Sequence, residues 1–220
     1  MKPDLRLNAI LDPQRSGGLA LPDLARRVVD GGATLLQLRD KTGGTRRMVE
    51  EARAIMAAVE GRGVPLVIND RVDVALAAGA AGVHVGWDDM DARDARRLLG
   101  PGAMIGLSIN SPGRAETGPL EAVDYVGIGG VFATLSKDNP NKPIGVEGLA
   151  RLIAIVRARR PGLPVVAIAG IDPTNAGAVM TTEADGVAVI SALSLAPDPT
   201  EAARTLRGIV DGALARRAPR

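Results

Sequence analysis

Eight short apolar runs recur along the chain, and each is followed by a polar or glycine-containing break and then by a segment with helical spacing. The runs are LRLNAIL, TLLQL, PLVI, GVHV, MIGLS, YVGIG, PVVAIAG and GVAVIS. The segments between them are amphipathic or rich in Ala, and only NSPGRAETGPLEA, after the fifth run, is a weak helix. Strands that alternate with helices form a parallel sheet, and eight such units predict a single (β/α)8 TIM barrel.

The composition agrees with one barrel and excludes several other classes of protein. The 220 residues are a usual length for this fold, so residues 1–220 are expected to form a single domain. A net charge of +2 provides no broad basic field for nucleic acid. The chain has no Cys, no signal-like apolar start and no apolar run of membrane-spanning length. We therefore expect a cytoplasmic protein that binds neither nucleic acid nor membrane.

Carboxylates follow the third and fourth predicted strands. Asp70 comes directly after PLVIN, and Asp88 and Asp89 come after GVHVGW. Because the carboxyl ends of parallel strands meet at one edge of a barrel, two carboxylates there can share a hard cation such as Mg²⁺. The alternative is that each Asp only caps the helix that follows it.

Two cations follow the second strand, in the segment QLRDK. Alternation along a strand sends Gln37, Arg39 and Lys41 to one side, where the two cations need an anionic partner such as diphosphate. The alternative is an internal ion pair with Asp40 or Glu50.

Hydroxyl groups follow the fifth and sixth strands. Ser108 ends the fifth run, where it can contact a phosphate or an amino group. The sixth strand runs into a long loop that carries Thr134, Ser136 and Lys137, which together can bind an anion. The alternative for this loop is a flexible lid with a solvated Lys.

Gly170 and Ser191 follow the seventh and eighth strands. In this fold the loops at these two positions commonly bind a phosphate, although a turn glycine and a helix-capping serine are the alternatives.

His84, the only His of the chain, lies inside the fourth strand and is expected to be packed and hydrogen-bonded. With one His and no Cys, a transition-metal site is not expected.

Taken in order, these segments resemble the thiamine-phosphate synthase family over nearly the whole chain. The matching segments are LQLRDK, INDRVDVALAAGAAGVHVG with the DDM that follows, IGLS, DYVGIGGVFAT with the SK that follows, VVAIAGI and GVAVISAL. The resemblance implies a barrel enzyme of thiamine biosynthesis, a Mg²⁺-dependent transferase with small-molecule substrates. Such an enzyme joins a pyrimidine diphosphate to a thiazole phosphate, or to its carboxylated form, and releases pyrophosphate and thiamine phosphate.

The resemblance also assigns roles to individual residues. It implies that the pyrimidine diphosphate binds in the segments containing Gln37, Leu38, Arg39, Asp40, Lys41, Asn69, Ser108 and Lys137. It implies that the thiazole phosphate binds near Thr134, Ser136, Gly170, Ile190 and Ser191. It places Mg²⁺ on Asp70 and Asp89 and leaves Asp88 as a neighbour. Arg39, Lys41, Ser108 and Lys137 are the expected catalytic residues, because they stabilise the departing diphosphate or contact the reacting substrate.

The chain departs from the family pattern at several positions. Trp87 stands where many members have Gln, Ile109-Asn110 where many have Thr-His, Ala133 where Pro is usual, Ser136 where Thr is usual, and Ala169 where the first of two glycines is common. The changes at Trp87 and Ile109-Asn110 concern the pyrimidine pocket, whereas the diphosphate and metal residues are retained.

Other functions fit the sequence less well. A thiazole-phosphate tautomerase-like paralogue without coupling activity would need no metal, and Asp70, Asp89, Arg39 and Lys41 would then have no evident role. A ligand-sensing regulatory protein needs an output module, for which eight βα units leave no segment. A phosphosugar epimerase rests on fold analogy alone and is weakened by the shortage of His. Whether the chain forms a homo-oligomer is not readable from the sequence.

Overall fold

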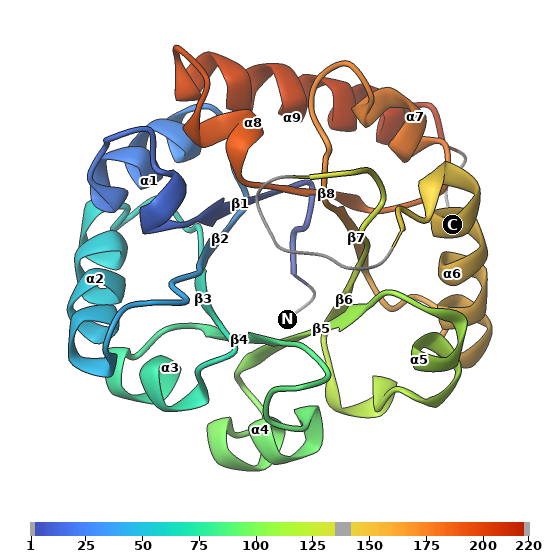
Figure 1. Ribbon diagram of the computed structural model, residues 1–220, viewed down its shortest axis with the longest axis horizontal. Coiled ribbons are helices and arrows are strands. Elements are labelled where there is room, and N and C mark those ends of the chain that lie inside the picture. The colour runs from blue at the N-terminus through green and yellow to red at the C-terminus, as the bar shows by residue number, and fades with distance from the viewer. Residues whose placement is uncertain (1–2, 135–141, 218–220) are drawn as a thin grey trace.

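The computed structural model describes residues 3–134 and 142–217. These residues form a closed barrel of eight parallel strands, ordered β1 to β8 with β8 paired to β1, and the helices surround it (Figure 1). The predicted TIM barrel is confirmed. No helix in the two described ranges is long and apolar enough to cross a membrane.

Every predicted apolar run overlaps one strand, and β3 and β5 each extend one residue beyond their runs. The strands are β1 (Leu7–Leu11), β2 (Leu35–Leu38), β3 (Leu66–Asn69), β4 (Gly82–Val85), β5 (Met104–Ile109), β6 (Tyr125–Ile128), β7 (Val165–Ile168) and β8 (Gly186–Val189). Their residues are almost all buried, as expected for a parallel sheet that has helices on one face and a filled interior on the other.

The helices fall between the strands. They are α1 (Leu21–Asp30), α2 (Thr45–Ala58), α3 (Val72–Ala78), α4 (Ala92–Leu99), α5 (Pro112–Thr117), α6 (Gly145–Arg159), α7 (Ala176–Met180), α8 (Ser191–Ser194) and α9 (Pro199–Ala215), with short 3-10 turns η1 (Pro13–Arg15) and η2 (Leu120–Ala122). The segment expected to be a weak helix becomes the short α5. The short helix α8 follows β8 directly.

Two apolar layers follow from the alternation of side chains along the strands. On β1, Leu7, Ala9 and Leu11 pack outward with the helices, whereas Ile10 points into the barrel with residues such as Val67 of β3. The interior layer also contains Leu35, Tyr125, Val166 and Ala188. Aliphatic side chains therefore fill most of the barrel, and Tyr125 is the one fully buried aromatic among the described residues.

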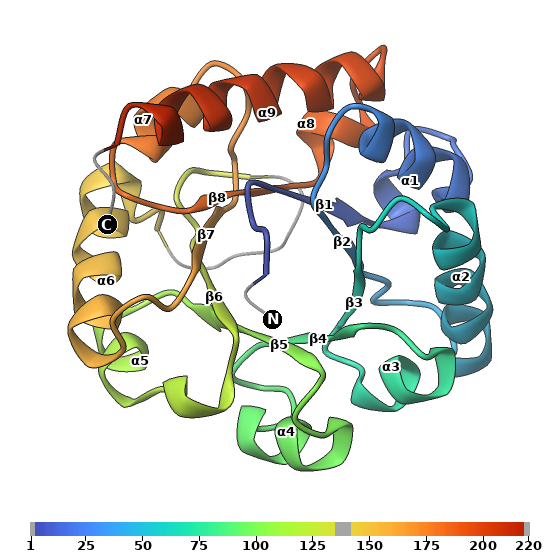
Figure 2. The same ribbon diagram turned by 180° about the vertical axis from the view of Figure 1, so that it is seen from behind.

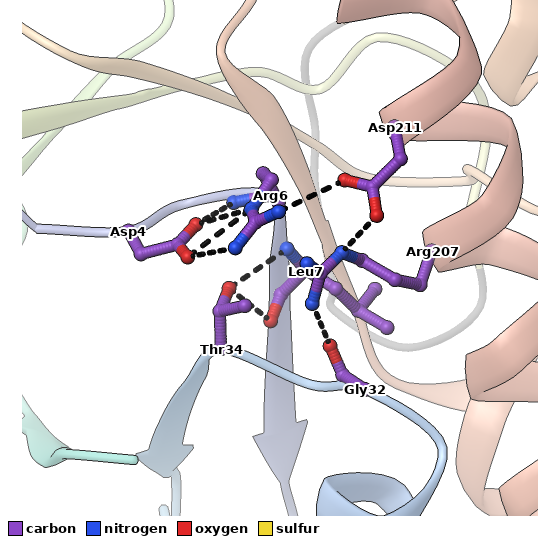
Figure 3. Close-up of polar contacts among 7 residues, drawn as sticks. All are labelled: Asp4, Arg6, Leu7, Gly32, Thr34, Arg207 and Asp211. Atoms are coloured by element: carbon purple, nitrogen blue, oxygen red, sulfur yellow. Dashed lines mark hydrogen bonds and ion pairs between the residues drawn. The ribbon is translucent and has the colours of Figure 1, made fainter. Parts of the chain in front are cut away.

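The amino-terminal segment closes the far end of the barrel. Leu5 belongs to the interior layer, and Figure 2 shows the segment before β1 lying across the centre of the ring. Figure 3 shows how Arg6 links this end to α9, since it binds Asp4 at 2.6 Å and Asp211 at 3.2 Å. Arg207 of α9 also binds Asp211, at 2.8 Å, and it donates to the carbonyl of Gly32. The amino-terminal segment and this polar network close one end of the barrel, so a site can open only at the opposite end.

Candidate functional site

A cavity of about 560 Å³ opens among the carboxyl ends of the strands. Residues from the ends of all eight strands line it, including Ile10, Gln37, Asn69, His84, Ser108, Gly127, Ile168 and Ala188. Its volume lies in the range of small-molecule sites, and the carboxyl end is where barrel enzymes place their active sites.

The cavity brings together most of the predicted binding residues. Those that line it are Gln37, Arg39, Asn69, Ser108, Thr134, Gly170, Ile190 and Ser191. Ser136 and Lys137 lie outside the described residues. The convergence has a simple cause, because seven of the eight residues lie at or just after the end of a strand, and Thr134 lies in the loop that follows β6.

Three predicted residues at the end of β2 and directly after it do not line the cavity. The side chain of Leu38 is buried in the outer layer, as alternation along the strand requires. Asp40 accepts hydrogen bonds from the backbone N–H groups of Thr42 and Gly43, and it therefore shapes the turn into α2. Lys41 lies outside the lining but contacts Asp70.

Arg39 forms an ion pair that the sequence did not reveal. Its Nη1 lies 2.5 Å from Oδ2 of Asp12, and both side chains are largely buried. The ion pair that we considered, with Asp40 or Glu50, does not form. Asp12 also accepts a hydrogen bond from the backbone of Gln14 with its other oxygen, so it caps η1 and fixes Arg39 at once. Its position directly after the first strand, equivalent to that of Asp70 after the third, was the available signal.

Asp70 and Asp89 meet at the mouth of the barrel. Their carboxyl groups are within hydrogen-bond contact, Lys41 Nζ contacts Asp70, and the backbone N–H of Gly86 donates to Asp89 Oδ2 at 2.7 Å. Burial and, next, the contact with Asp70 raise the pKa of Asp89 above its usual value. Two carboxyl groups held this close repel each other when both are ionised, and a cation between them removes that repulsion.

The capping alternative is wrong for both residues. Helix α3 begins after Arg71 with no side-chain cap, and α4 is capped by Asp91, which accepts from the backbone of Arg93 at 2.8 Å. Asp70 instead has a left-handed backbone, with φ of 64°. Asp89 is oriented by a loop N–H and not by a helix, so neither carboxylate is used at a helix terminus.

His84 joins two other side chains on the wall of the cavity. Its Nδ1 lies 3.1 Å from the hydroxyl of Tyr125, and its Nε2 lies 2.9 Å from Oγ of Ser108. Burial raises the pKa of the Tyr125 phenol well above its ordinary value, so this hydroxyl stays protonated. The prediction of a packed, hydrogen-bonded His is confirmed. That it also lines the cavity was not foreseen.

Two glycines make room for these rings. A Cβ at Gly106 would lie 2.3 Å from Cζ of Tyr125 and 2.4 Å from Nδ1 of His84. A Cβ at Gly127 would lie 3.0 Å from Cε1 of His84. The glycines of β5 and β6 therefore leave space for the rings of His84 and Tyr125.

The loops after β6 and β7 pack against each other at the opposite side of the cavity. Phe132 N donates to the carbonyl of Ala169 at 3.1 Å, and a Cβ on Gly170 would lie 2.4 Å from the carbonyl oxygen of Ala133. Gly170 has φ of 66°, and Ala169 has the same hand with φ of 82°. Ser191 is the first residue of α8, and Ile190 occupies the N-cap position. The capping alternative for Ser191 is therefore wrong, and Gly170 is required by close backbone packing.

The lining contains further polar residues that are not among the predicted binding residues. Arg15 lines the cavity from η1, and Asn110 lines it directly after β5. The carboxylate pair is too small to form a complete metal site alone, since no group of three or more His, Cys, Asp or Glu side chains suited to a metal occurs within residues 3–134 and 142–217. Any cation on Asp70 and Asp89 would take its other ligands from substrate and water.

Comparison with known proteins gives one consistent family. The family model described as thiamine monophosphate synthase matches residues 7–193. The thiamine-phosphate synthase of Agrobacterium fabrum is 52% identical over 218 residues, covering 99% of each chain. That of Azorhizobium caulinodans is 46% identical over 208 residues, covering 94% of this chain and 96% of the relative. A solved structure of thiamine phosphate pyrophosphorylase from Pyrococcus furiosus aligns with a TM-score of 0.83 and 35% identity, over 97% of this chain and 98% of that one.

Proposed function

Because the chain belongs to the thiamine monophosphate synthase family, we propose that it forms thiamine phosphate from a pyrimidine diphosphate and a thiazole phosphate and releases pyrophosphate. The carboxylated thiazole phosphate is included, and its carboxyl group then leaves as carbon dioxide. The protein is a transferase of thiamine biosynthesis. The relatives reported above carry synthase names and give no support to a thiazole-phosphate tautomerase without coupling activity. We further propose that the protein acts in the cytoplasm.

One observation carries this proposal. A single cavity is lined on one side by Gln37, Arg39 and Asn69, and on the other by Thr134, Gly170 and Ser191. The first group suits a diphosphate and its attached ring, and the second suits a phosphate. A site with two anion-binding sides in one space can hold two phosphorylated substrates against each other, and such orientation is a large part of catalysis of a bimolecular reaction.

The carboxylate pair fits the expected Mg²⁺. Asp70 and Asp89 offer hard oxygen ligands, burial and then their mutual contact raise the pKa of Asp89, and neither is used as a helix cap. When bound, Mg²⁺ would stabilise negative charge on the diphosphate leaving group. Lys41, which contacts Asp70, would add a positive charge to the same end of the cavity.

The diphosphate side of the cavity is arranged for leaving-group stabilisation. Arg39 lines the cavity and is held by Asp12, so its guanidinium does not have to be ordered when substrate binds. We propose that Arg39, Lys41 and Lys137 bind the diphosphate, that Gln37 and Asn69 contact the same substrate, and that Ser108 contacts its reacting end. Leu38 and Asp40 contribute through the backbone and the turn of their segment.

The other side of the cavity would hold the thiazole phosphate. Thr134, Gly170, Ile190 and Ser191 line this side and come from the loops after β6, β7 and β8. Ser136 belongs to the same proposed site. The left-handed backbone at Gly170 permits the close approach of loop and substrate that phosphate binding by N–H groups needs.

No side chain has to act as a nucleophile in this reaction. The bond between the methylene carbon and the diphosphate oxygen breaks, and its electron pair leaves with the diphosphate. The thiazole nitrogen then supplies the pair for the new carbon–nitrogen bond. The chain has no Cys, and both ring nitrogens of His84 are engaged with Tyr125 and Ser108. The residues thus orient the substrates and stabilise the departing anion.

A direct assay tests the proposed function. The purified protein is incubated with the pyrimidine diphosphate, the thiazole phosphate and Mg²⁺, and pyrophosphate and thiamine phosphate are measured together. Equal amounts of both products are expected. Release of neither product, with both substrates shown to bind, would contradict the proposal, as would conversion of the thiazole phosphate alone.

A further inference from the structure

Trp87, the only Trp of the chain, lies in the loop after β4 and does not line the cavity. It is 37% exposed, yet its Nε1–H donates a hydrogen bond to the carbonyl oxygen of Ser108 at 3.1 Å. Ser108 is the residue of β5 whose hydroxyl contacts His84 in the cavity. The indole therefore holds the backbone of a cavity residue from outside.

Arg114 of α5 continues this contact to the next part of the lining. Its guanidinium carbon lies 5.1 Å from the centre of the Trp87 ring, within the range of a cation–π interaction. Its Nη1 donates to Oδ1 of Asn110 at 3.0 Å. Asn110 lines the cavity directly after β5, so Trp87 and Arg114 together contact both Ser108 and Asn110.

These contacts join two sequence departures that are separate along the chain. Trp87 and Asn110 both stand where the family pattern has other residues, and in the structure Arg114 connects them. Replacement of either residue alone would remove one of these two contacts of Arg114. The two departures therefore act together to fix the end of β5, and they are not unrelated changes at the surface.

We propose that Trp87 and Arg114 are positioning residues, which hold Ser108 and Asn110 in the cavity and thereby set how this chain binds the pyrimidine diphosphate. The inference rests on the proposed function, because Ser108 is assigned there to the pyrimidine substrate. Neither residue lines the cavity, so each acts through the strand end that it contacts.

Separate steady-state measurements for the two substrates test this inference. In Trp87→Gln, which removes both the ring and its N–H, kcat/KM for the pyrimidine diphosphate is expected to fall about 10-fold, since small displacements of a positioned group carry costs of this order or larger. The KM for the thiazole phosphate stays unchanged. Trp87→Phe keeps an aromatic ring beside Arg114 but loses the N–H. Its kcat/KM for the pyrimidine diphosphate is expected to lie between the values of Trp87→Gln and the wild type.

Two further variants separate positioning from stability. Leu76→Gln replaces another exposed apolar side chain, on α3, and is expected to keep the kinetics of both substrates. In the double variant Trp87→Gln/Arg114→Gln the loss is expected to be smaller than the product of the two single losses, because the residues act together.

The outcomes distinguish this inference from the proposed function. A wild-type protein that releases no pyrophosphate refutes the function itself. If the wild type is active but Trp87→Gln changes only the melting temperature, or weakens both substrates equally, the positioning role is overturned. Fully multiplicative losses in the double variant overturn the coupling between the two residues.

Discussion

Asp12 at the end of β1 binds Arg39 at the end of β2, with 2.5 Å between Oδ2 and Nη1. The register of the two strands explains the contact, because Leu11 is paired with Leu38 and the next residue on each strand is then adjacent. Asp12 is 3% exposed and Arg39 is 14% exposed at the side chain, so the pair is shielded from water. It presents a fixed cation to the cavity.

Removing the negative charge of this pair should destabilise the protein and make its thermal stability depend more strongly on bound ligand. Asp12→Asn is expected to lower the free energy of unfolding by about 2–3 kcal/mol, because Arg39 keeps a largely buried charge without its partner. Pyrophosphate with Mg²⁺ should then raise the melting temperature of the variant more than that of the wild type. Equal ligand-induced shifts in thermal unfolding would argue against Arg39 as a diphosphate contact.

Removing either carboxylate of the proposed metal site should abolish most of the turnover while the barrel stays folded. Asp70→Asn and Asp89→Ala are each expected to lose about 100-fold or more at limiting Mg²⁺, because a bound metal ion stabilises leaving-group charge by several kcal/mol. Asn is chosen at position 70 because it tolerates the left-handed backbone there. Turnover is measured as pyrophosphate release against Mg²⁺ concentration.

The neighbouring Asp88 supplies the matched control for the metal site. It is exposed, and Asp88→Ala should keep the Mg²⁺ dependence of the wild type. Near wild-type turnover in both Asp70→Asn and Asp89→Ala at limiting Mg²⁺ would remove the metal assignment.

Filling the space beside the His84 ring should damage the cavity wall. A Cβ at Gly106 meets both Tyr125 and His84 closer than atoms can approach, so Gly106→Ala is expected to cost about 1–3 kcal/mol of stability. Gly113→Ala in α5 has open space around its Cβ and should be neutral or stabilising. Denaturant unfolding compares the two. Similar stabilities would show that the rings move aside at little cost.

Ala169 has a backbone conformation that favours glycine. Its φ of 82° costs a side-chain-bearing residue about 1 kcal/mol, so Ala169→Gly should raise the melting temperature by about 1–3 °C, after the added chain entropy of glycine is subtracted. Ala167→Gly, on the regular strand β7, should instead lower it. A lower melting temperature for both variants would contradict the strain argument.

Arg15 adds a cation to the lining beside the proposed thiazole phosphate side. Its turn packs on α8, since a Cβ at Gly17 would meet the carbonyl of Ser194 at 2.5 Å. Arg15→Gln is expected to raise KM for the thiazole phosphate about 10-fold, the usual size of a lost charge-assisted hydrogen bond, and to leave KM for the pyrimidine diphosphate unchanged. An effect confined to the KM of the pyrimidine diphosphate would contradict the assignment of Arg15 to the thiazole phosphate.

Much of the fold and many of the cavity residues could be predicted from the local sequence pattern. Apolar runs of strand length alternate with helical periods, and a residue that directly follows such a run must lie at the carboxyl end of the barrel. This placed Gln37, Asn69, Ser108 and Gly170 correctly in one lining. It could not show that Asp91 takes the cap of α4, because that depends on which way the loop turns after the strand.

The sequence by itself determined the eight strands and the residues that follow them, because strand periodicity and helix spacing are properties of neighbouring residues along one chain. Only the tertiary structure decided which of those residues touch. Asp12 reaches Arg39, Asp70 reaches Asp89, and Trp87 reaches Ser108 because barrel closure sets the register between strands and the loops set where each side chain points. Contacts between separate strands depend on the whole closed sheet, and no local segment contains that information.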